Sequence, residues 1–218
     1  MEESKSSRRR FFPFTVVLLF ALTVIAFLTE THIGRLSAGW LEHLGFAPQD
    51  LWRGHWERLL TSALVTESAR AFWQAFLMIV LAVGTLEYAI GARLTAFMFW
   101  GFHLLTLLFV SLMVALPLHL FGFSTGTVLI VARDVGPSAG YFGCLGLAIW
   151  QWSKISKIAK LILTVSIGSG LLAVSSRTIL FQNDQSILLI AGLSHVVAFF
   201  LGWLSLPLVR RWHSEASA

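Results

Sequence analysis

Long apolar stretches alternate with short polar ones along most of the chain, and these stretches predict its architecture. A helix that crosses a bilayer needs about 20 mainly apolar residues, within a range of roughly 17–25. Six segments are candidates for such helices: Phe12–Leu28, Ala71–Ile90, Leu94–Leu116, Ser138–Trp152, Ile158–Ser175 and Ile187–Val209. The pattern therefore predicts an all-α membrane protein, built as a bundle of six transmembrane helices.

Composition supports a bilayer as the solvent for this chain of 218 residues. Apolar residues make up 56% of it and charged residues only 12%, against about a quarter in soluble domains. So little charge excludes disorder, nucleic-acid binding as a main role and most soluble enzymes. Nine Trp and eighteen Phe fit aromatic belts at the membrane surfaces. The single cysteine, Cys144, excludes an internal disulfide and a thiolate metal cluster.

The first apolar segment has two interpretations. Phe12–Leu28 follows three arginines, as the apolar part of a signal peptide would. We interpret it as a retained anchor, because the run is long for a signal peptide and Leu-Thr-Glu-Thr-His is not a small-residue cleavage site. The predicted organisation is then a cytoplasmic tail over residues 1–11, a six-helix domain over 12–209 and a second cytoplasmic tail over 210–218.

Basic residues orient the predicted bundle. With six spans, four basic clusters fall on one side, which is then the cytoplasmic side of a bacterial-type inner membrane, with both termini inside. The opposite side carries the long connection Thr29–Arg70, predicted to be a partly embedded hairpin of short helices. The four clusters are Arg8 to Arg10, Arg93, the group Lys154, Lys157 and Lys160, and the pair Arg210 and Arg211.

Ser138 opens the short fourth segment, in the sequence Asp-Val-Gly-Pro-Ser-Ala-Gly-Tyr. Pro137 and the flanking glycines favour a break in the backbone followed by the start of a helix. Unpaired N–H groups and the positive end of the helix converge there, so the position suits an oxyanion. The alternative is a serine that only caps the helix.

His195 lies inside the sixth segment. Ionisable or strongly polar groups at membrane depth are costly, so each is a functional hypothesis; Gln74, Glu87 and His103 belong to the same class. For His195 the alternative is a structural hydrogen bond to a neighbouring helix. Glu87 and His103 are expected to have structural roles, Glu87 by bonding the backbone or Arg93.

Ser138 and His195 are expected to lie at similar depths below the outer face of the membrane. The fourth segment is about 22 Å long as a helix and stops roughly 8 Å short of the outer face of a core about 30 Å thick. His195 lies about 12 Å below the outer end of the sixth segment, so both residues reach a similar depth. Irregular backbone above a short helix requires a protein-lined or wet cavity. No buried Asp or Glu is expected there, so the predicted unit is a dyad in which His195 activates Ser138.

These residues resemble the rhomboid family of intramembrane serine proteases, over most of the chain from Trp56 onward. That family has a six-helix core, a nucleophilic serine in a Gly-x-Ser-Gly motif opening a short fourth helix, and a histidine base on the sixth helix. Here Gly-Pro-Ser138-Ala is similar to the first motif, with Gly146 eight residues further on. Ser-His195 followed by Gly202 is similar to the second motif.

Two further segments add to the resemblance. Trp56-Glu-Arg58 resembles the Trp-Arg pair that the family carries in its first loop. Gly84 to Gly91, with Glu87 between them, is similar to the glycine- and glutamate-containing segment that closes the family's second helix.

The departures from the family pattern concern the groups around the reacting atoms. Ala139 stands where the glycine after the nucleophile is expected, and Phe142 where a tyrosine is common. The resemblance implies side-chain oxyanion donors on the second helix, where this chain has Arg70 and Gln74 in place of His and Asn. Gln74 can still donate an amide N–H, whereas Arg70 either stabilises the oxyanion or extends to the outer surface. Losing one donor costs about 10²–10³ in rate, so altered or weak activity is expected.

The sequence thus predicts a serine endopeptidase that cleaves transmembrane protein substrates near the outer membrane face, with the lipid bilayer as its other partner. No nucleic acid, cofactor or metal is expected, and the sequence does not predict an oligomeric state. One alternative is a catalytically inactive rhomboid-like protein that binds membrane clients. Another is a small transporter or channel, which would carry paired intramembrane charges or an inverted repeat; neither is found in the sequence.

Overall fold

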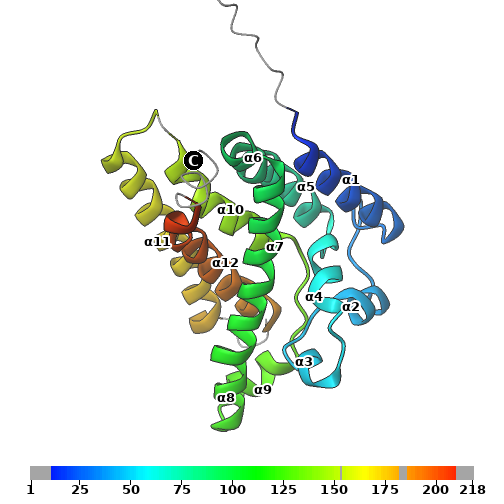
Figure 1. Ribbon diagram of the computed structural model, residues 1–218. Coiled ribbons are helices and arrows are strands. Elements are labelled where there is room, and N and C mark those ends of the chain that lie inside the picture. Colours follow the sequence, from blue (N-terminus) through cyan, green and yellow to red (C-terminus); the bar gives the residue numbers. More distant parts are fainter. Residues whose placement is uncertain (1–10, 153, 182–185, 210–218) are drawn as a thin grey trace, which may run out of the picture.

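The computed structural model describes residues 11–152, 154–181 and 186–209, so most of the predicted N-terminal tail and the whole C-terminal tail lie outside the described residues. Every regular element in these ranges is a helix, apart from two isolated β-bridges (Figure 1). In chain order they are α1 (Pro13–Leu28), α2 (Ala38–Leu44), α3 (Asp50–Arg53), α4 (Arg58–Thr61), η1 (Ser62–Leu64), α5 (Ala69–Met78), η2 (Ile79–Val83), α6 (Gly84–Ile90), α7 (Ala92–Phe109), η3 (Val110–Ala115), α8 (Leu116–Leu120), α9 (Ser124–Val131), α10 (Ser138–Gln151), α11 (Lys157–Phe181) and α12 (Ser186–Leu204).

Within the described residues, four helical stretches are long and apolar enough to cross a membrane. They are Ala69–Ile90, Ala92–Leu120, Lys157–Ser175 and Ile190–Val209, and the first two run through π-helical turns at η2 and η3. The predicted all-helical fold is therefore confirmed for the described residues. Four of the six predicted spans are long and apolar enough to cross a membrane, which favours a multi-pass membrane protein. The other two predicted spans are shorter helices: α1 has 16 residues and α10 has 14.

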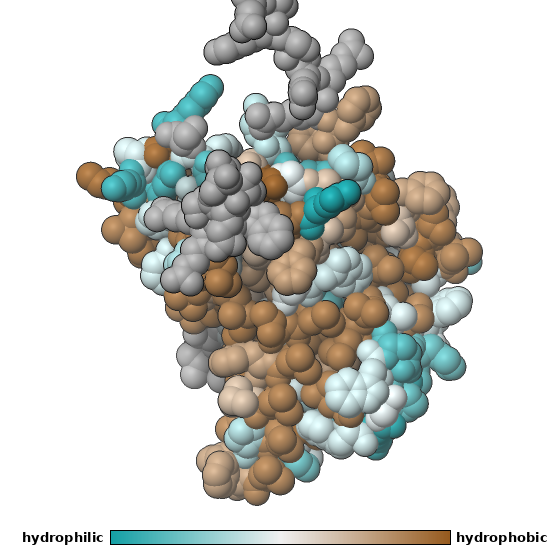
Figure 2. All heavy atoms as spheres, in the orientation of Figure 1, coloured by the Kyte–Doolittle hydropathy of each residue, from teal (hydrophilic) through white to brown (hydrophobic). Residues whose placement is uncertain are grey.

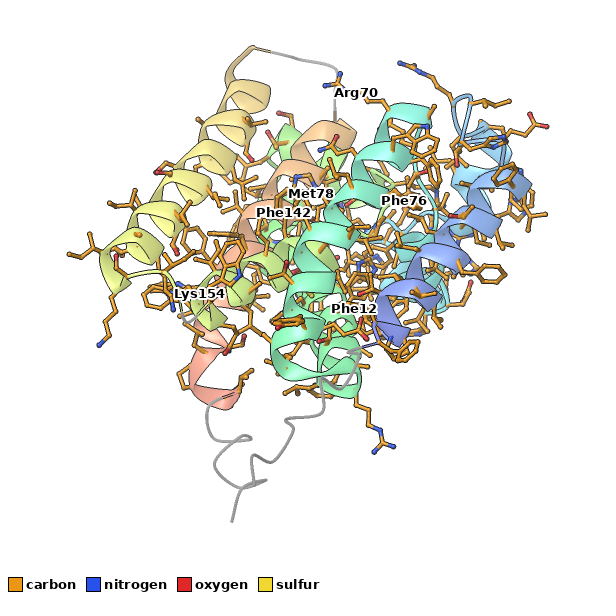
Figure 3. All side chains as sticks on the ribbon, turned by 90° about the horizontal axis from the view of Figure 1, so that it is seen from above. Phe12, Arg70, Phe76, Met78, Phe142 and Lys154 are labelled. Carbon is orange, nitrogen blue, oxygen red and sulfur yellow. The ribbon has the colours of Figure 1, made fainter. Side chains whose placement is uncertain are left out.

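The two ends of the bundle differ in charge and in the length of their connections. In Figure 3, Phe12 and Lys154 lie toward one end of the bundle and Arg70 lies beyond the other. We name the first the basic end, because Arg93 at the start of α7, Lys154 between α10 and α11, and Lys157 and Lys160 at the start of α11 lie there. We name the opposite one the loop end, because the long connections 29–68 and 121–137 gather there.

Helix α10 lies at the centre of the bundle, where α7, α12 and the α5–α6 helix surround it (Figure 1). Small residues make this position possible, because a Cβ added at Gly140 or Gly143 would overlap the ring of Phe99 or Phe102 on α7. On the side facing α12, a Cβ at Gly202 would overlap the carbonyl of Gly143. The contact between Gly202 and Gly143 brings backbone against backbone, the usual way in which helices pack closely in membranes.

Glu87 joins α6 to the start of α1. Its carboxylate accepts hydrogen bonds from the backbone N–H of Phe14 at 3.0 Å and of Thr15 at 2.8 Å, and from the Thr15 hydroxyl at 2.6 Å. The first N–H groups of a helix have no partner within it, and a negative charge stabilises that end. The predicted structural role of Glu87 is thus confirmed, with the backbone as its partner, and it fixes α1 against the bundle.

The outer surface of the bundle is broadly apolar. Figure 2 shows hydrophobic atoms across the middle of the visible face, with hydrophilic atoms gathered toward the top and the lower right. Only 17% of the Lys157–Ser175 span is buried, against 39% of Ala69–Ile90. Apolar surface on this scale would be unfavourable in water, and it matches a hydrocarbon surrounding.

Candidate functional site

The backbone before α10 sets the position of Ser138. Gly136 adopts a φ of 131°, a conformation that side chains with a Cβ rarely adopt, and its N–H donates to the carbonyl of Ser62 at 2.8 Å. Pro137 then precedes the helix, and its carbonyl accepts the first helical hydrogen bond, from Tyr141 N–H, at 3.0 Å. Ser138 is therefore the first residue of α10, as the sequence predicts, and its side chain is half-buried.

His195 is brought toward α10 by the close packing of α12. The overlaps that a Cβ would make at Gly202 with Gly143, and at Gly146 with the carbonyl of Phe199, mark the place where the two backbones touch. His195 lies one turn before Phe199. Its ring packs on the ring of Phe142, with centroids 4.6 Å apart and planes inclined by 41°.

Ser138 and His195 line one cavity of about 210 Å³. Both side chains are half-buried, and the cavity contains polar atoms from α5, α10, α12 and the two long connections. Among the described residues, no hydrogen bond joins the Ser138 hydroxyl to the imidazole of His195. The remaining lining residues are Glu67, Ala71, Gln74, Ala75, Asp134, Val135, Gly136, Pro137, Tyr141 and Ala191.

The two side chains predicted as oxyanion donors lie differently. Gln74 on α5 lines the cavity with Ser138. Arg70, one turn earlier, is exposed, is not among the lining residues and extends beyond the end of the helix in Figure 3. Both residues are exposed, but only Gln74 lines the cavity, and the oxyanion roles of both stay predictions.

Asp134 is an acidic group at the cavity that the sequence analysis did not single out. Its side chain is buried, with 8% of the residue exposed, so the expectation of no buried acid near Ser138 and His195 is wrong. Burial raises the pKa of Asp134 to about 7, and the negative charge of Glu67 adds to the rise, while a hydrogen bond with the Val135 backbone opposes it. Its position four residues before Ser138 was the available signal.

A buried charge cluster holds the long connection 29–68 against the segment that precedes Ser138. Asp50 is fully buried, and its two carboxylate oxygens accept from Arg58 and Arg133, each at 2.8 Å. Arg133 also donates to the carbonyl of Gly45 and to Glu42, both at 3.1 Å. From the sequence, Arg58 was noted only as part of the segment that resembles the rhomboid Trp-Arg pair. Asp50 and Arg133 were missed, because their neighbours in the sequence do not distinguish them from charges at a surface.

Backbone contacts complete this attachment. Phe46 and Asp134 form an antiparallel bridge, with N···O distances of 3.1 and 2.8 Å, and Gln49 N–H donates to the carbonyl of Ile130 at 3.0 Å. The short helices predicted in this connection are confirmed as α2, α3 and α4, and their partial embedding in the membrane stays a prediction. These helices and their connections therefore contact the backbone just before Ser138, at Ile130 and Asp134.

His103 does not belong to the cavity. Its Nε2 lies 2.9 Å from the carbonyl of Leu59, which accepts the hydrogen bond, and this agrees with the structural role expected for it. In the part of the chain that the structure describes, no three His, Cys, Asp or Glu side chains are grouped as a metal site would require.

Comparison of the chain with family models and with curated proteins finds no match. The cavity and its residues therefore carry the functional argument alone.

Proposed function

We propose that the chain is a rhomboid-like intramembrane serine endopeptidase whose catalytic residues are Ser138 and His195. One observation carries the proposal: a serine at the N-terminus of a short central helix, a histidine on the neighbouring helix and Gln74 line one small cavity. An imidazole is the usual base for a serine hydroxyl, and helix N–H groups are suited to a developing oxyanion.

The reaction follows from these groups. His195 accepts the Ser138 hydroxyl proton as Oγ attacks a peptide carbonyl, and the N–H of Ser138, with the Gln74 amide, stabilises the oxyanion. The C–N bond breaks as His195 passes its proton to the leaving amine, and the acyl group stays on Ser138 Oγ as an ester. Water then attacks the ester, His195 takes the water proton and returns it to Ser138, and the new carboxyl end is released.

The bundle suits a substrate that is itself a membrane helix. Helix α10 is about 21 Å long, against a hydrocarbon core of about 30 Å, so a cavity at its start lies below the loop-end surface. We assign the basic end to the cytoplasm, because basic connections prefer that side. An intact helix hides its carbonyls, so transmembrane segments that unwind near the outer face are the expected substrates.

A fluorophosphonate probe tests the proposal with purified protein in detergent. Covalent labelling is expected in the wild type, and it should vanish in Ser138→Ala and fall at least about 10³-fold in His195→Ala. Ser156→Ala, in the α10–α11 connection, is the control and should label normally. Absence of labelling in a folded wild type, or labelling that persists in Ser138→Ala, would overturn the proposal.

A second candidate is a catalytically inactive rhomboid-like protein that binds membrane clients. One observation favours it: Arg70 lies outside the cavity. Within the described residues no hydrogen bond joins Ser138 to His195, but catalytic hydrogen bonds often tighten only when substrate is bound, so this is compatible with either candidate. An unlabelled Ser138 in a protein that still retains transmembrane clients would favour this one.

A further inference from the structure

Two acidic side chains line the cavity beside Ser138, and they come from different parts of the chain. Glu67 is exposed and stands just before Ser68, the N-cap of α5. Asp134 is 8% exposed and lies in the segment that leads into α10. The cavity therefore has one acid at its accessible rim and a second in its buried wall.

Neither acid has a positively charged partner among the described residues. The nearest arginine in sequence, Arg133, is committed to Asp50 and Glu42. Arg70 is exposed and is not a lining residue. A buried carboxylate without a cation is unfavourable, and the raised pKa of Asp134, about 7, expresses that cost.

The size of the cavity limits which cation could pair with Glu67 and Asp134. The cavity measures about 210 Å³, below the roughly 300–1,000 Å³ of sites that hold drug-sized molecules. It is suited to one extended side chain that enters beside the serine. A lysine or arginine side chain has an apolar stem for the wall residues and a cationic head for the two acids.

We propose that Glu67 and Asp134 make the cavity selective for substrates with a lysine or arginine next to the bond that is cut. This inference rests on the proposed function and adds the substrate class. Attraction between the cation and two acids, one of them buried, favours such a substrate over a neutral one of the same shape.

Two fluorophosphonates of equal chain length, one ending in an ammonium group and the other in a methyl group, test the selectivity. Their rates of labelling Ser138 are compared at pH 8. The ammonium probe is expected to react about tenfold faster in the wild type. The ratio should fall toward one in Glu67→Gln and in Asp134→Asn, whereas Glu30→Gln, which removes an exposed acid at the same end, should keep it.

The outcomes separate this inference from the proposed function. Labelling by the methyl probe with no advantage for the ammonium probe overturns the selectivity alone, as does an advantage that survives Glu67→Gln. No labelling by either probe overturns the proposed function, and the selectivity with it. Since Glu67 is exposed, its variant is expected to fold even if Asp134→Asn does not.

Discussion

The imidazole of His195 lies on the ring of Phe142, one helical turn beyond Ser138, with the ring centroids 4.6 Å apart. Phe142 thus packs against the imidazole from α10. A packed aromatic neighbour restricts the rotation of the histidine ring, and a base held in one orientation loses less freedom when it accepts a proton.

Removing that neighbour should slow the chemistry without unfolding the bundle. Phe142→Ala is expected to lower the fluorophosphonate labelling rate of Ser138 about tenfold, whereas Phe142→Tyr keeps the ring and should stay within about twofold. Phe97→Ala, on an exposed ring of α7, is the control. Equal labelling of Phe142→Ala and wild type would show that the ring does not orient His195.

The contact between Gly202 and Gly143 predicts a large effect of a single methyl group. Gly202→Ala should lower the free energy of unfolding in detergent by about 1–3 kcal/mol, because the added Cβ overlaps the Gly143 carbonyl and forces α10 and α12 apart. Gly101→Ala on α7 is the matched control, since nothing lies within 4 Å of its added Cβ. A Gly202→Ala variant as stable as Gly101→Ala would contradict the packing.

Glu87 should contribute to stability through the start of α1. Glu87→Ala leaves the N–H groups of Phe14 and Thr15 without their acceptor, at a cost of about 1–3 kcal/mol in unfolding free energy. Glu87→Gln retains an acceptor oxygen and should lose about half as much. Thermal unfolding in detergent measures both, and Glu57→Ala, an exposed acid, should change little. Equal losses in the two Glu87 variants would argue against the cap.

The cluster around Asp50 should stabilise the attachment of the long connection. Asp50→Asn leaves Arg58 and Arg133 partly buried without a counter-charge and is expected to cost about 3 kcal/mol. Glu42→Gln changes an exposed partner of the same arginine and should cost less than about 0.5 kcal/mol. Limited proteolysis within residues 29–68, faster in Asp50→Asn alone, is the measurement; equal rates would count against this attachment.

Asp134 should make stability depend on pH. Its folded pKa of about 7 lies above the ordinary value of 3.8, so the folded state holds this proton more tightly than the unfolded state. The resulting stabilisation is complete below pH 4 and is lost as the pH rises through 7. The difference in unfolding temperature between wild type and Asp134→Asn should therefore shift against the wild type from pH 5 to pH 8. A difference that does not change with pH would show that Asp134 ionises normally.

Much of the secondary structure follows from local sequence. Apolar runs long enough to cross a membrane predicted Ala71–Ile90 and Leu94–Leu116, and the structure extends these to Ala69–Ile90 and Ala92–Leu120. Pro137 and its neighbouring glycine predicted the start of α10, because both restrict the backbone independently of distant residues. These features need only hydrophobic length and backbone geometry.

The ion-pair partners and the burial of charged side chains, in contrast, could not be predicted from local sequence. Asp50 and Arg133 are far apart along the chain, and each alone has the appearance of an ordinary surface charge. Asp134 was missed as a buried acid because burial depends on what folds over a residue, here Phe46 and the connection 29–68.

By itself, then, the sequence determined which stretches are helical and which of them are apolar enough for a bilayer. It also indicated Ser138 and His195 as candidates for a catalytic pair. Only the tertiary structure decided that Gln74 reaches their cavity while Arg70 does not, and that two acids share it. The physical reason is that helix formation depends on neighbours within a few residues, whereas a site depends on the packing of helices whose contacts are set by small residues far apart in the chain.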